Sequence, residues 1–397
     1  MSSSLQEKRQ LADRLVRWFR GHQRDLPWRR TKDPYHIWVS EIMLQQTRVD
    51  TVIPYFNRFI SLFPTIEALA EADEADLLKA WEGLGYYSRV RNMQIAARTI
   101  KEQYGGRMPD TPEEIGQLRG IGPYTAGAVL SIAYGKPVPA VDGNVLRVMS
   151  RICLLYDDIA KPAARVRVEQ LIEDIIPEDA AGDFNQSLME LGAMVCTPRS
   201  PKCGDCPVRE LCSAYAAGAV DELPVKSKAK KPRHEELAAY IIEGTGEHEG
   251  EVLLRRRPKD GLLARMWELP NEHLSFDAQR QLGLDERFFM EAEHVFSHIR
   301  WQMKVYRCKD HEADQVLGMR LPRREAEPSV LEATATYGQA NQAPSDAKPS
   351  VSETAPDHEA GQPFDHEEEY AWVSADTWRH HALPNVFLRI LGQYFAR

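Results

Sequence analysis

Four cysteines lie close together near the middle of the chain, in the spacing Cys196-x6-Cys203-x2-Cys206-x5-Cys212. Four thiolates can hold a tetrahedral zinc ion or a four-iron cluster. Zinc ribbons usually present two separated CxxC pairs, whereas one CxxC occurs in this sequence. The spacing therefore predicts a metal centre and leaves zinc and iron both open. Four unrelated structural cysteines are the alternative.

The length and charge of the chain set its broad class. With 397 residues the chain is long enough for two or three domains. Its net charge of −9 at pH 7 gives no overall sign of nucleic-acid binding, which requires only a local basic patch. The N-terminus has no apolar signal-peptide core, and no apolar run approaches the roughly 20 residues that span a bilayer. We therefore expect a soluble, monomeric, cytoplasmic protein with no targeting signal and no membrane partner.

The hydrophobic pattern divides the chain into three parts. Residues 1–225 show helical spacing of apolar side chains and no alternating strand pattern, so they are expected to be helical. Residues 226–234 form a basic linker, marked by a run of lysines and Arg233. Residues 235–397 contain short strand-like runs and are expected to form a second domain. Within it, residues 323–365 are rich in Ala, Glu, Pro, Ser and Thr, which predicts a disordered insertion.

Several elements can be placed within these parts. Pro54 is expected to separate two short helices, because proline cannot donate a backbone hydrogen bond. Ala238–Ile242 and Glu251–Arg255 are expected to be strands joined by the Gly-rich turn Gly244–Gly250. Leu383–Phe395 has the pattern of a closing helix.

The segment Leu118–Ala126 has the form LxGxGxxTA, which is typical of two helices joined by a hairpin. Gly120 and Gly122 let the backbone turn tightly and approach another chain closely. The backbone N–H groups that open the next helix can then bind a phosphate, helped by the helix dipole. An ordinary turn between two helices is the alternative interpretation of this segment taken alone.

Two carboxylates are candidates for acid–base chemistry. Glu41 shares a helical face with Ile37 and Leu44, and an apolar setting raises the pKa of a carboxyl group and makes it a usable acid. Asp142 precedes an expected helix, whose N-terminus helps to keep it ionised. Asn144 is placed to hydrogen-bond to Glu41 or to an attacking water. A surface glutamate and a plain helix N-cap are the alternatives, but two carboxylates in different environments can together break a glycosidic bond.

These segments resemble the endonuclease III and MutY family of DNA glycosylases. The resemblance implies an all-α helix–hairpin–helix region with an iron–sulfur loop at residues 196–212, followed by a Nudix-like α/β domain, so that the whole chain has an α + (α+β) architecture. It favours a [4Fe–4S] cluster as the cofactor, held by Cys196, Cys203, Cys206 and Cys212. It also implies that the partner is double-stranded DNA with adenine opposite 8-oxoguanine or guanine, and that the protein associates with a bacterial nucleoid.

The resemblance implies roles for individual residues. Glu41 is expected to protonate adenine N7 and then to assist the attack of water. Asp142 is expected to stabilise, or transiently bond to, the sugar carbon. Lyases of the endonuclease III type carry a lysine where this chain has Tyr124. Because tyrosine cannot form a Schiff base with the sugar, we expect a monofunctional glycosylase in which the Tyr124 hydroxyl supports the carboxylates.

Further residues match the family's contacts with DNA. An enzyme that acts on a base within a duplex must flip the base out and fill the gap. Gln46 and Tyr86 match the wedge positions, with core packing as the alternative for Tyr86. Trp28, Arg29 and Gln186 match the segments that line the adenine pocket. Trp28 is expected to stack on the base and Arg29 to reach its edge, with a plain core role as the alternative for Trp28.

The C-terminal part resembles the family's Nudix-like domain. The glutamate-rich REx2EE signature of active Nudix hydrolases is missing, so we expect no magnesium pyrophosphatase. Phe296, Ser297 and His298 match the family's Phe-Ser-His loop. In that loop Phe296 is expected to wedge near 8-oxoguanine, and Ser297 to hydrogen-bond to its altered edge.

Three other functions remain open at this point. The first is a glycosylase of the same fold that removes thymine or uracil opposite guanine, which the C-terminal domain disfavours. The second is a non-catalytic DNA-binding protein that uses the cluster and the hairpin for structure, which the pair Glu41 and Asp142 disfavours. The third is a Nudix hydrolase with a DNA-binding extension, which the missing signature disfavours.

Overall fold

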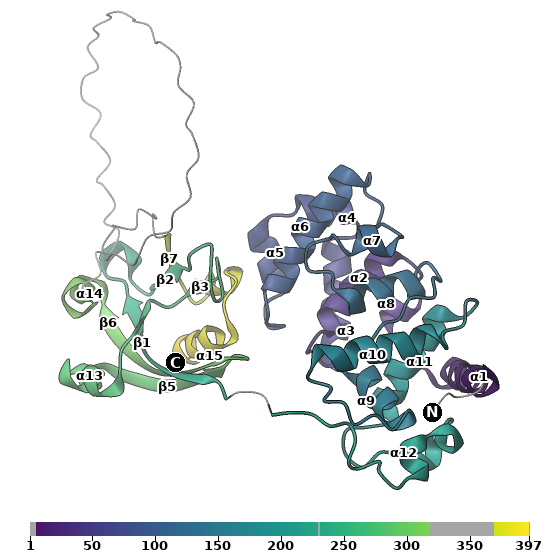
Figure 1. Ribbon diagram of the computed structural model, residues 1–397. Helices are drawn as coiled ribbons and strands as arrows, with labels where there is room; N and C mark the ends of the chain where they lie inside the picture. Colours follow the sequence, from purple (N-terminus) through teal and green to yellow (C-terminus); the bar gives the residue numbers. More distant parts are fainter. Residues whose placement is uncertain (1–4, 229–230, 318–368, 397) are drawn as a thin grey trace, which may run out of the picture. The chain divides into compact units, whose positions relative to one another are not determined.

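The computed structural model describes residues 5–228, 231–317 and 369–396 (Figure 1). The described residues divide into two compact units, one within 1–235, 292–302 and 377–397 and the other within 236–291 and 303–376. The expected domain boundaries at residues 225 and 235 stay a prediction. The expected insertion at residues 323–365 lies outside the described residues.

The first part of the chain is helical, as predicted (Figure 1). Several helices begin at a side chain that caps the first turn, for example Asp33, Thr65 and Asp73. No helix among the described residues is long and apolar enough to cross a membrane. The helices of this part are α1 (Leu5–His22), α2 (Pro34–Leu44), α3 (Val49–Leu62), α4 (Ile66–Glu71), α5 (Glu74–Ala80), α6 (Ser88–Gln103), α7 (Pro112–Ile115), α8 (Pro123–Ile132), α9 (Gly143–Ile152), α10 (Pro162–Glu173), α11 (Ala181–Met194) and α12 (Ser213–Ala216), with short 3-10 turns η1 (Pro27–Arg29), η2 (Cys203–Asp205) and η3 (Arg209–Leu211).

The expectation that Pro54 separates two helices is wrong. Pro54 lies inside α3, where it is exposed to solvent. Val52, Phe56 and Phe59 are buried on another face of the same helix. The packing of that apolar face keeps α3 continuous through a residue that cannot donate a backbone hydrogen bond.

Helix α11 is packed between several other helices and positions many of the residues considered below. It contacts α1, α8 and α9, while α2 contacts α8. Leu15, Val148, Phe184 and Leu188 belong to an apolar core that α1, α9 and α11 share. A Cβ atom placed on Gly182 would lie 2.7 Å from the backbone oxygen of Ser131, so the backbones of α11 and α8 touch where only glycine fits.

The second part of the chain contains a seven-stranded sheet, counted over the described residues. The strand order is β3-β2-β1-β6-β5, with β4 paired to β1 and β7 paired to β2. The strands and helices of this part are β1 (Arg233–Glu243), β2 (Val252–Arg256), β3 (Trp267–Glu268), β4 (Asn271–His273), α13 (Phe276–Gln281), β5 (Phe288–Val295), β6 (Ile299–Lys309), α14 (Asp310–Leu317), β7 (Tyr370–Val373) and α15 (Asn385–Phe395), with 3-10 turns η4 (Gly246–His248), η5 (Leu284–Arg287) and η6 (Trp378–His380).

The predicted strands and the closing helix are confirmed. Strands β1 and β2 are antiparallel, and Glu243 pairs with Val252 across the Gly-rich turn. The second half of β1 is continuously buried, as expected for a strand covered on both faces. Tyr240 and Tyr306 belong to the apolar core on one side of this sheet.

We predict that Gly127→Ala lowers the free energy of unfolding by about 1–3 kcal/mol. Gly127 lies in α8, and a Cβ atom there would lie 1.9 Å from the backbone oxygen of Pro139. Because the obstructing atom is backbone, the clash cannot be relieved by rotating a side chain. Urea denaturation measures the effect.

Gly21→Ala is the matched control, because Gly21 lies in α1 and a Cβ atom there would meet nothing within 4 Å. We expect it to be neutral or to stabilise the protein by about 0.5–1 kcal/mol. Equal unfolding midpoints for the two variants would contradict the close packing of α8.

Candidate active site

A cavity of about 710 Å³ lies in the helical part of the chain. Residues of η1, α2, α8 and α11 and the start of α9 line it. Gly120 and Tyr86 lie outside this lining. The cavity brings together these residues that the sequence analysis selected: Trp28, Arg29, Glu41, Gln46, Gly122, Tyr124, Asp142, Asn144 and Gln186.

Glu41 is the buried acid that the sequence predicts. Only 6% of the residue is exposed, and Ile37 and Leu44 line the same cavity. The Tyr124 hydroxyl donates a hydrogen bond to Oε2 of Glu41. Burial raises the pKa of Glu41 to about 7; the bond from Tyr124 opposes the rise, and the charge of Asp142 adds to it. Glu41 can therefore carry or release a proton near neutral pH.

Asp142 is the N-cap of α9, as its position in the sequence suggests. Its Oδ1 accepts a hydrogen bond from the backbone N–H of Val145 at 2.7 Å, and its Oδ2 accepts one from Asn144 Nδ2 at 2.8 Å. Burial raises the pKa of Asp142, and these donors oppose the rise. The helix N-terminus thus acts in the expected direction, although burial outweighs it. Both oxygens of Asp142 receive donors, which favours its ionised form over that of Glu41.

Of the two partners expected for Asn144, the structure does not show Glu41, and the bond to an attacking water stays a prediction. Asn144 bonds to Asp142 rather than to Glu41, because it lies in the first turn of the helix that Asp142 caps. Its Oδ1 accepts a hydrogen bond from Arg147 Nη2 at 2.8 Å, and Arg147 Nε donates to the backbone oxygen of Cys196 at 2.9 Å. A continuous chain of hydrogen bonds therefore joins Asp142 to the cysteine loop.

Glu190 is a buried residue of the cavity that the sequence analysis missed. Its side chain is 1% exposed and accepts hydrogen bonds from Arg24 Nη2 at 2.7 Å and from Arg29 Nη2 at 2.9 Å. Burial acts to raise the pKa of Glu190, but the bonds from Arg24 and Arg29 outweigh it and lower the pKa to about 2. Glu190 follows Gln186 by one helical turn on α11, and this spacing is the signal that identifies it.

Trp28 is placed both to pack in the core and to stack on a base in the cavity, the two roles that the sequence left open. The residue is 5% exposed, its ring packs edge to face on Phe56 with centroids 5.4 Å apart, and it also lines the cavity. Gln186 lines the cavity as well, with its Nε2 donating to the backbone oxygen of Gly182 at 3.2 Å. Arg29 is held by Glu190 rather than free in the cavity.

The hairpin between α7 and α8 has two glycines in different conformations. Gly120 has a left-handed backbone, with φ of 81°, and a Cβ atom there would lie 2.7 Å from Cβ of Asn92. Gly122 precedes α8 with φ of −95°, and a Cβ atom there would meet nothing within 4 Å. Gly120 is therefore required by the fold, whereas the space at Gly122 is open to an approaching group.

The two predicted wedge residues share an unusual backbone conformation. Gln46 and Tyr86 both have positive φ, 56° and 49°, which side chains other than glycine rarely adopt. Gln46 is exposed, and Tyr86 is 44% exposed. Tyr86 is therefore not a core residue, whereas the neighbouring Tyr87 is buried.

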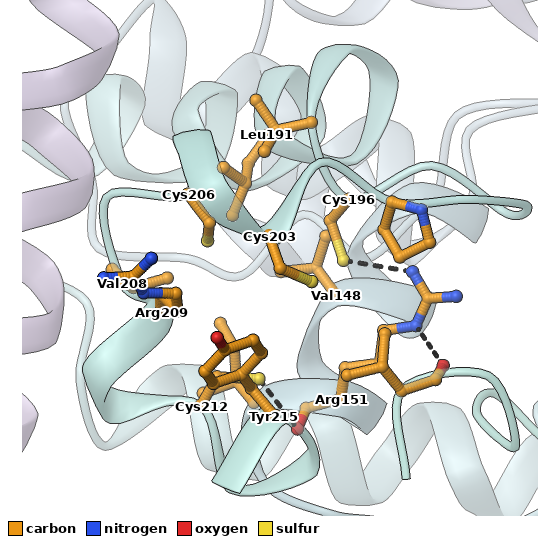
Figure 2. Close-up of a pocket in the computed structure, with 14 residues that line it drawn as sticks. Val148, Arg151, Leu191, Cys196, Cys203, Cys206, Val208, Arg209, Cys212 and Tyr215 are labelled. Atoms are coloured by element: carbon orange, nitrogen blue, oxygen red, sulfur yellow. Dashed lines mark hydrogen bonds between the residues drawn. The ribbon is translucent and has the colours of Figure 1, made fainter. Parts of the chain in front are cut away.

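The four clustered cysteines surround one space. Figure 2 shows the sulfur atoms of Cys196, Cys203, Cys206 and Cys212 turned toward it. All four are free thiols. Arg151 Nη1 donates to Cys196 Sγ at 3.3 Å. The other walls are mostly apolar side chains, including these: Val148, Ile152, Leu191, Val195, Val208 and Val220.

These thiols fit the chemistry of an iron–sulfur cluster. Within the described ranges, no group of three or more His, Cys, Asp or Glu side chains is arranged to hold a metal ion. In a four-iron cluster each thiolate binds a different iron, so the thiols need not converge on one point. The nearby Arg151 guanidinium suits a group that carries net negative charge, and the apolar wall limits the access of water to it.

The Phe-Ser-His loop forms the turn between β5 and β6. The Phe296 ring packs against the rings of His294 and Trp301, with centroids 4.5 Å and 4.8 Å away. Ser297 and His298 are exposed, and Ser297 Oγ lies 3.1 Å from His298 Nδ1. The loop therefore presents two polar side chains next to an aromatic ring that is packed in place.

We predict that Glu190→Gln lowers the free energy of unfolding by about 3 kcal/mol, because it leaves two guanidinium groups without a charge partner in a buried site. The contribution of the wild-type carboxylate is complete above pH about 5 and is lost as the pH falls toward the folded-state pKa of about 2. Urea denaturation at several pH values measures both effects. Glu210→Gln is the control, since the ion pair of Glu210 with Arg14 is exposed and should contribute less than about 1 kcal/mol. Similar losses in both variants would contradict the buried network.

Three family models match the chain. Residues 39–177 match the HhH-GPD superfamily base excision DNA repair protein, residues 196–212 the iron-sulfur binding domain of endonuclease III, and residues 240–336 the NUDIX domain. These matches confirm the predicted fold class, a helix–hairpin–helix glycosylase region followed by a Nudix-like domain. They also identify the cysteine segment as an iron–sulfur binding loop.

Curated relatives extend the similarity over most of the chain. Human adenine DNA glycosylase is 36% identical over 74% of this chain, and the match spans 65% of the human protein. The adenine DNA glycosylase of Schizosaccharomyces pombe is 31% identical over 76% of this chain and 82% of its own length. That of Buchnera aphidicola subsp. Acyrthosiphon pisum is 33% identical over 72% of this chain and 83% of its own length. The chain belongs to the adenine DNA glycosylase family.

Proposed function

We propose that this protein is a monofunctional DNA glycosylase that hydrolyses the N-glycosidic bond of adenine mispaired with 8-oxoguanine or guanine in duplex DNA, which starts base excision repair. Family membership supports the proposal, and one structural observation carries it. A single cavity holds two carboxylates, the buried Glu41 and the half-buried Asp142, and their hydrogen-bond donors differ: Tyr124 donates to Glu41, whereas donors reach both oxygens of Asp142. Such a pair suits a reaction that needs one acid and one anion.

Glu41 supplies the proton. Cleavage of the bond between the sugar carbon and the adenine nitrogen leaves the bonding electrons on the base, which is a poor leaving group until it is protonated. With a pKa of about 7, Glu41 is substantially protonated at neutral pH and can donate to adenine N7. The resulting carboxylate then accepts a proton from the attacking water, which restores the starting state.

Asp142 supplies the negative charge. The sugar develops positive charge as the base leaves, and a preorganised anion stabilises it without having to reorganise. The donors from Val145 and Asn144 hold both oxygens of Asp142 in place. Asp142 either stabilises the cation or bonds to it transiently. Tyr124 completes the group through its bond to Glu41, and since it has no amine it cannot form a Schiff base.

Other parts of the chain bind the DNA in this proposal. The N–H groups that open α8 at Gly122 receive a phosphate. Gln46 and Tyr86 fill the gap left by the flipped adenine. Trp28, Arg29 and Gln186 contact the adenine in the cavity. The protein acts as a monomer on the duplex.

Cys196, Cys203, Cys206 and Cys212 would hold a [4Fe–4S] cluster. When bound, the cluster ties together a loop that consists of short 3-10 turns. Arg151 would then face a cluster thiolate, and Arg147 would connect the backbone of this loop to Asn144.

Release of adenine from a panel of duplexes tests the proposal. The duplexes carry adenine opposite 8-oxoguanine, guanine, cytosine or thymine, and we expect release in the first two. Glu41→Gln, which keeps the shape of the side chain but has no acidic proton to transfer, should bind the duplex and release no base. Release of thymine or uracil opposite guanine instead would point to the rival glycosylase. Strand cleavage by the pure protein at the rate of base release would contradict a monofunctional enzyme.

We predict that Tyr124→Phe moves the alkaline limb of the pH–rate profile to higher pH. The wild-type rate should fall above pH about 7, where Glu41 loses the proton that it donates. Since the bond from Tyr124 lowers the pKa of Glu41, its removal leaves burial to raise that pKa further. Single-turnover rates between pH 6 and 9 (about three units around the pKa) measure the limb.

Tyr134→Phe is the matched control, because the Tyr134 hydroxyl donates to the backbone oxygen of Met108 away from the cavity. Its profile should overlay that of the wild type. A limb that moves to lower pH in Tyr124→Phe would show that Glu41 is not the acid.

We predict that replacing Phe296, Ser297 and His298 together by alanine lowers the preference for 8-oxoguanine over guanine by about tenfold, since a neutral hydrogen bond contributes about 1 kcal/mol net. 8-Oxoguanine differs from guanine by an O8 acceptor and an N7–H donor, and Ser297 and His298 can supply both complements. The measurement is the ratio of single-turnover rates on the two duplexes. Glu247→Ala with Glu249→Ala, in the exposed β1–β2 turn, is the control. An unchanged ratio in the folded triple variant would show that the loop is structural.

A further inference from the structure

Two short loops carry the proposed wedge residues, and each has a strained residue at its tip. Gln46 lies between α2 and α3, and Tyr86 lies just before α6. Their φ values of 56° and 49° fall in the left-handed region, which is unfavourable for residues that have a Cβ atom. Such residues keep this conformation only where surrounding contacts determine it.

The Arg89 side chain contacts both loops at once. Its Nη1 donates to the backbone oxygens of Ile42 and Gln45, each at 2.7 Å. Its Nη2 donates to the backbone oxygens of Leu84 and Gly85, at 3.2 Å and 3.1 Å. One planar group thus joins the end of the Gln46 loop to the start of the Tyr86 loop.

Two aromatic rings contact the Arg89 guanidinium. Its central carbon lies 5.3 Å from the ring centroid of Trp81 and 5.5 Å from that of Tyr86. Trp81 Nε1 donates to the backbone oxygen of Gly85 at 3.1 Å, so the ring is itself tied to the same loop. Arg89 therefore contacts one wedge side chain directly as well as the backbone of both loops.

The acceptors of Arg89 explain why an arginine is needed. The hydrogen bonds described for its side chain all end on backbone carbonyls. Those of Ile42 and Met43 belong to the last turn of α2, where the helix dipole is negative and favours a cation. Lysine has a single nitrogen and cannot span two sets of carbonyls as the fork of a guanidinium does.

We propose that Arg89 is a positioning residue that holds the Gln46 and Tyr86 loops in one fixed arrangement, so that both wedges enter the duplex together; this inference rests on the proposed function. Helix α2 also carries Glu41, one residue before Ile42. Arg89 therefore fixes the wedge loops relative to the helix that presents the acid. Without it, the two loops relax independently and the flipped state is less populated.

The test compares two substrates for Arg89→Met and Arg89→Lys. The first is a duplex with adenine opposite 8-oxoguanine, in which the wedges must replace a paired base. The second has adenine in a single-stranded loop, where there is no pair to open. We expect single-turnover release to fall at least about tenfold on the duplex and much less on the loop, because the wedge residues that Arg89 positions act only where a paired base has to be flipped out. The fluorescence of 2-aminopurine in place of adenine reports flipping directly and should fall in parallel on the duplex.

Arg58→Met is the matched control. Arg58 Nη2 donates to the backbone oxygen of Ala80 at 2.7 Å, and its guanidinium lies 5.0 Å from the ring centroid of Tyr55, so it makes similar contacts without touching either wedge loop. Its rates on both substrates should match those of the wild type.

A double-mutant cycle keeps the test decisive if Arg89→Met folds poorly. Arg89→Lys should add little further loss to a variant that already carries Gln46→Ala and Tyr86→Ala, because the group that it positions is gone. Equal losses on the duplex and the loop, or additive losses in the cycle, would overturn the positioning role. If the wild type releases adenine from neither substrate, the proposed function fails instead.

Discussion

The placement of two carboxylates, the buried Glu41 and the half-buried Asp142, in one cavity is the constraint on which the arrangement of the helical part depends. Both groups lose hydration there and repel each other, so the fold has to stabilise one as an acid and the other as an anion. Tyr124 satisfies Glu41 with a single donor, while the N-terminus of α9 and Asn144 satisfy both oxygens of Asp142. The difference in donors separates the two groups chemically, and a difference of this kind is what general acid catalysis at neutral pH requires.

The helices that form the apolar core also line the cavity, because α11 packs closely against α1, α8 and α9 and carries residues of both. A Cβ atom on Gly192 would lie 2.7 Å from Cβ of Asn144, so α11 approaches α9 where Asn144 bonds to Asp142. Glu190, one turn after Gln186 on α11, neutralises Arg24 and Arg29 at the cavity wall. Glycines that pack helices together therefore also determine how precisely the Asp142 carboxylate is held.

Features of the fold and the site that depend on nearby residues could be predicted from the sequence. Contacts between residues far apart in the chain could not. The cysteine spacing, the hairpin glycines and the apolar face around Glu41 depend on neighbours within a few residues, so the sequence shows them. The spacing from Gln186 places Glu190 on the cavity face of α11, but Arg24 and Arg29 lie far from it in the chain, and no local pattern connects them to it. Asn144 bonds to Asp142 because it lies in the first turn of the helix that Asp142 caps. Pro54 remained helical because packing of the α3 face outweighed its propensity.

Adenine is a normal base, so the chemistry of the cavity cannot by itself make removal of adenine safe. Under the proposed function, selectivity has to come from residues that contact the opposite base, and their contribution to binding has to be small enough to be lost when guanine replaces 8-oxoguanine. A rigid loop suits this, because a flexible one would adapt to either base. The Phe296 ring is held between His294 and Trp301, while Ser297 and His298 remain exposed. A loop anchored by an aromatic ring, with a few exposed hydrogen-bonding groups, can distinguish 8-oxoguanine from guanine by about the free energy of one or two hydrogen bonds. That difference is enough to bias the equilibrium between the stacked and the flipped adenine.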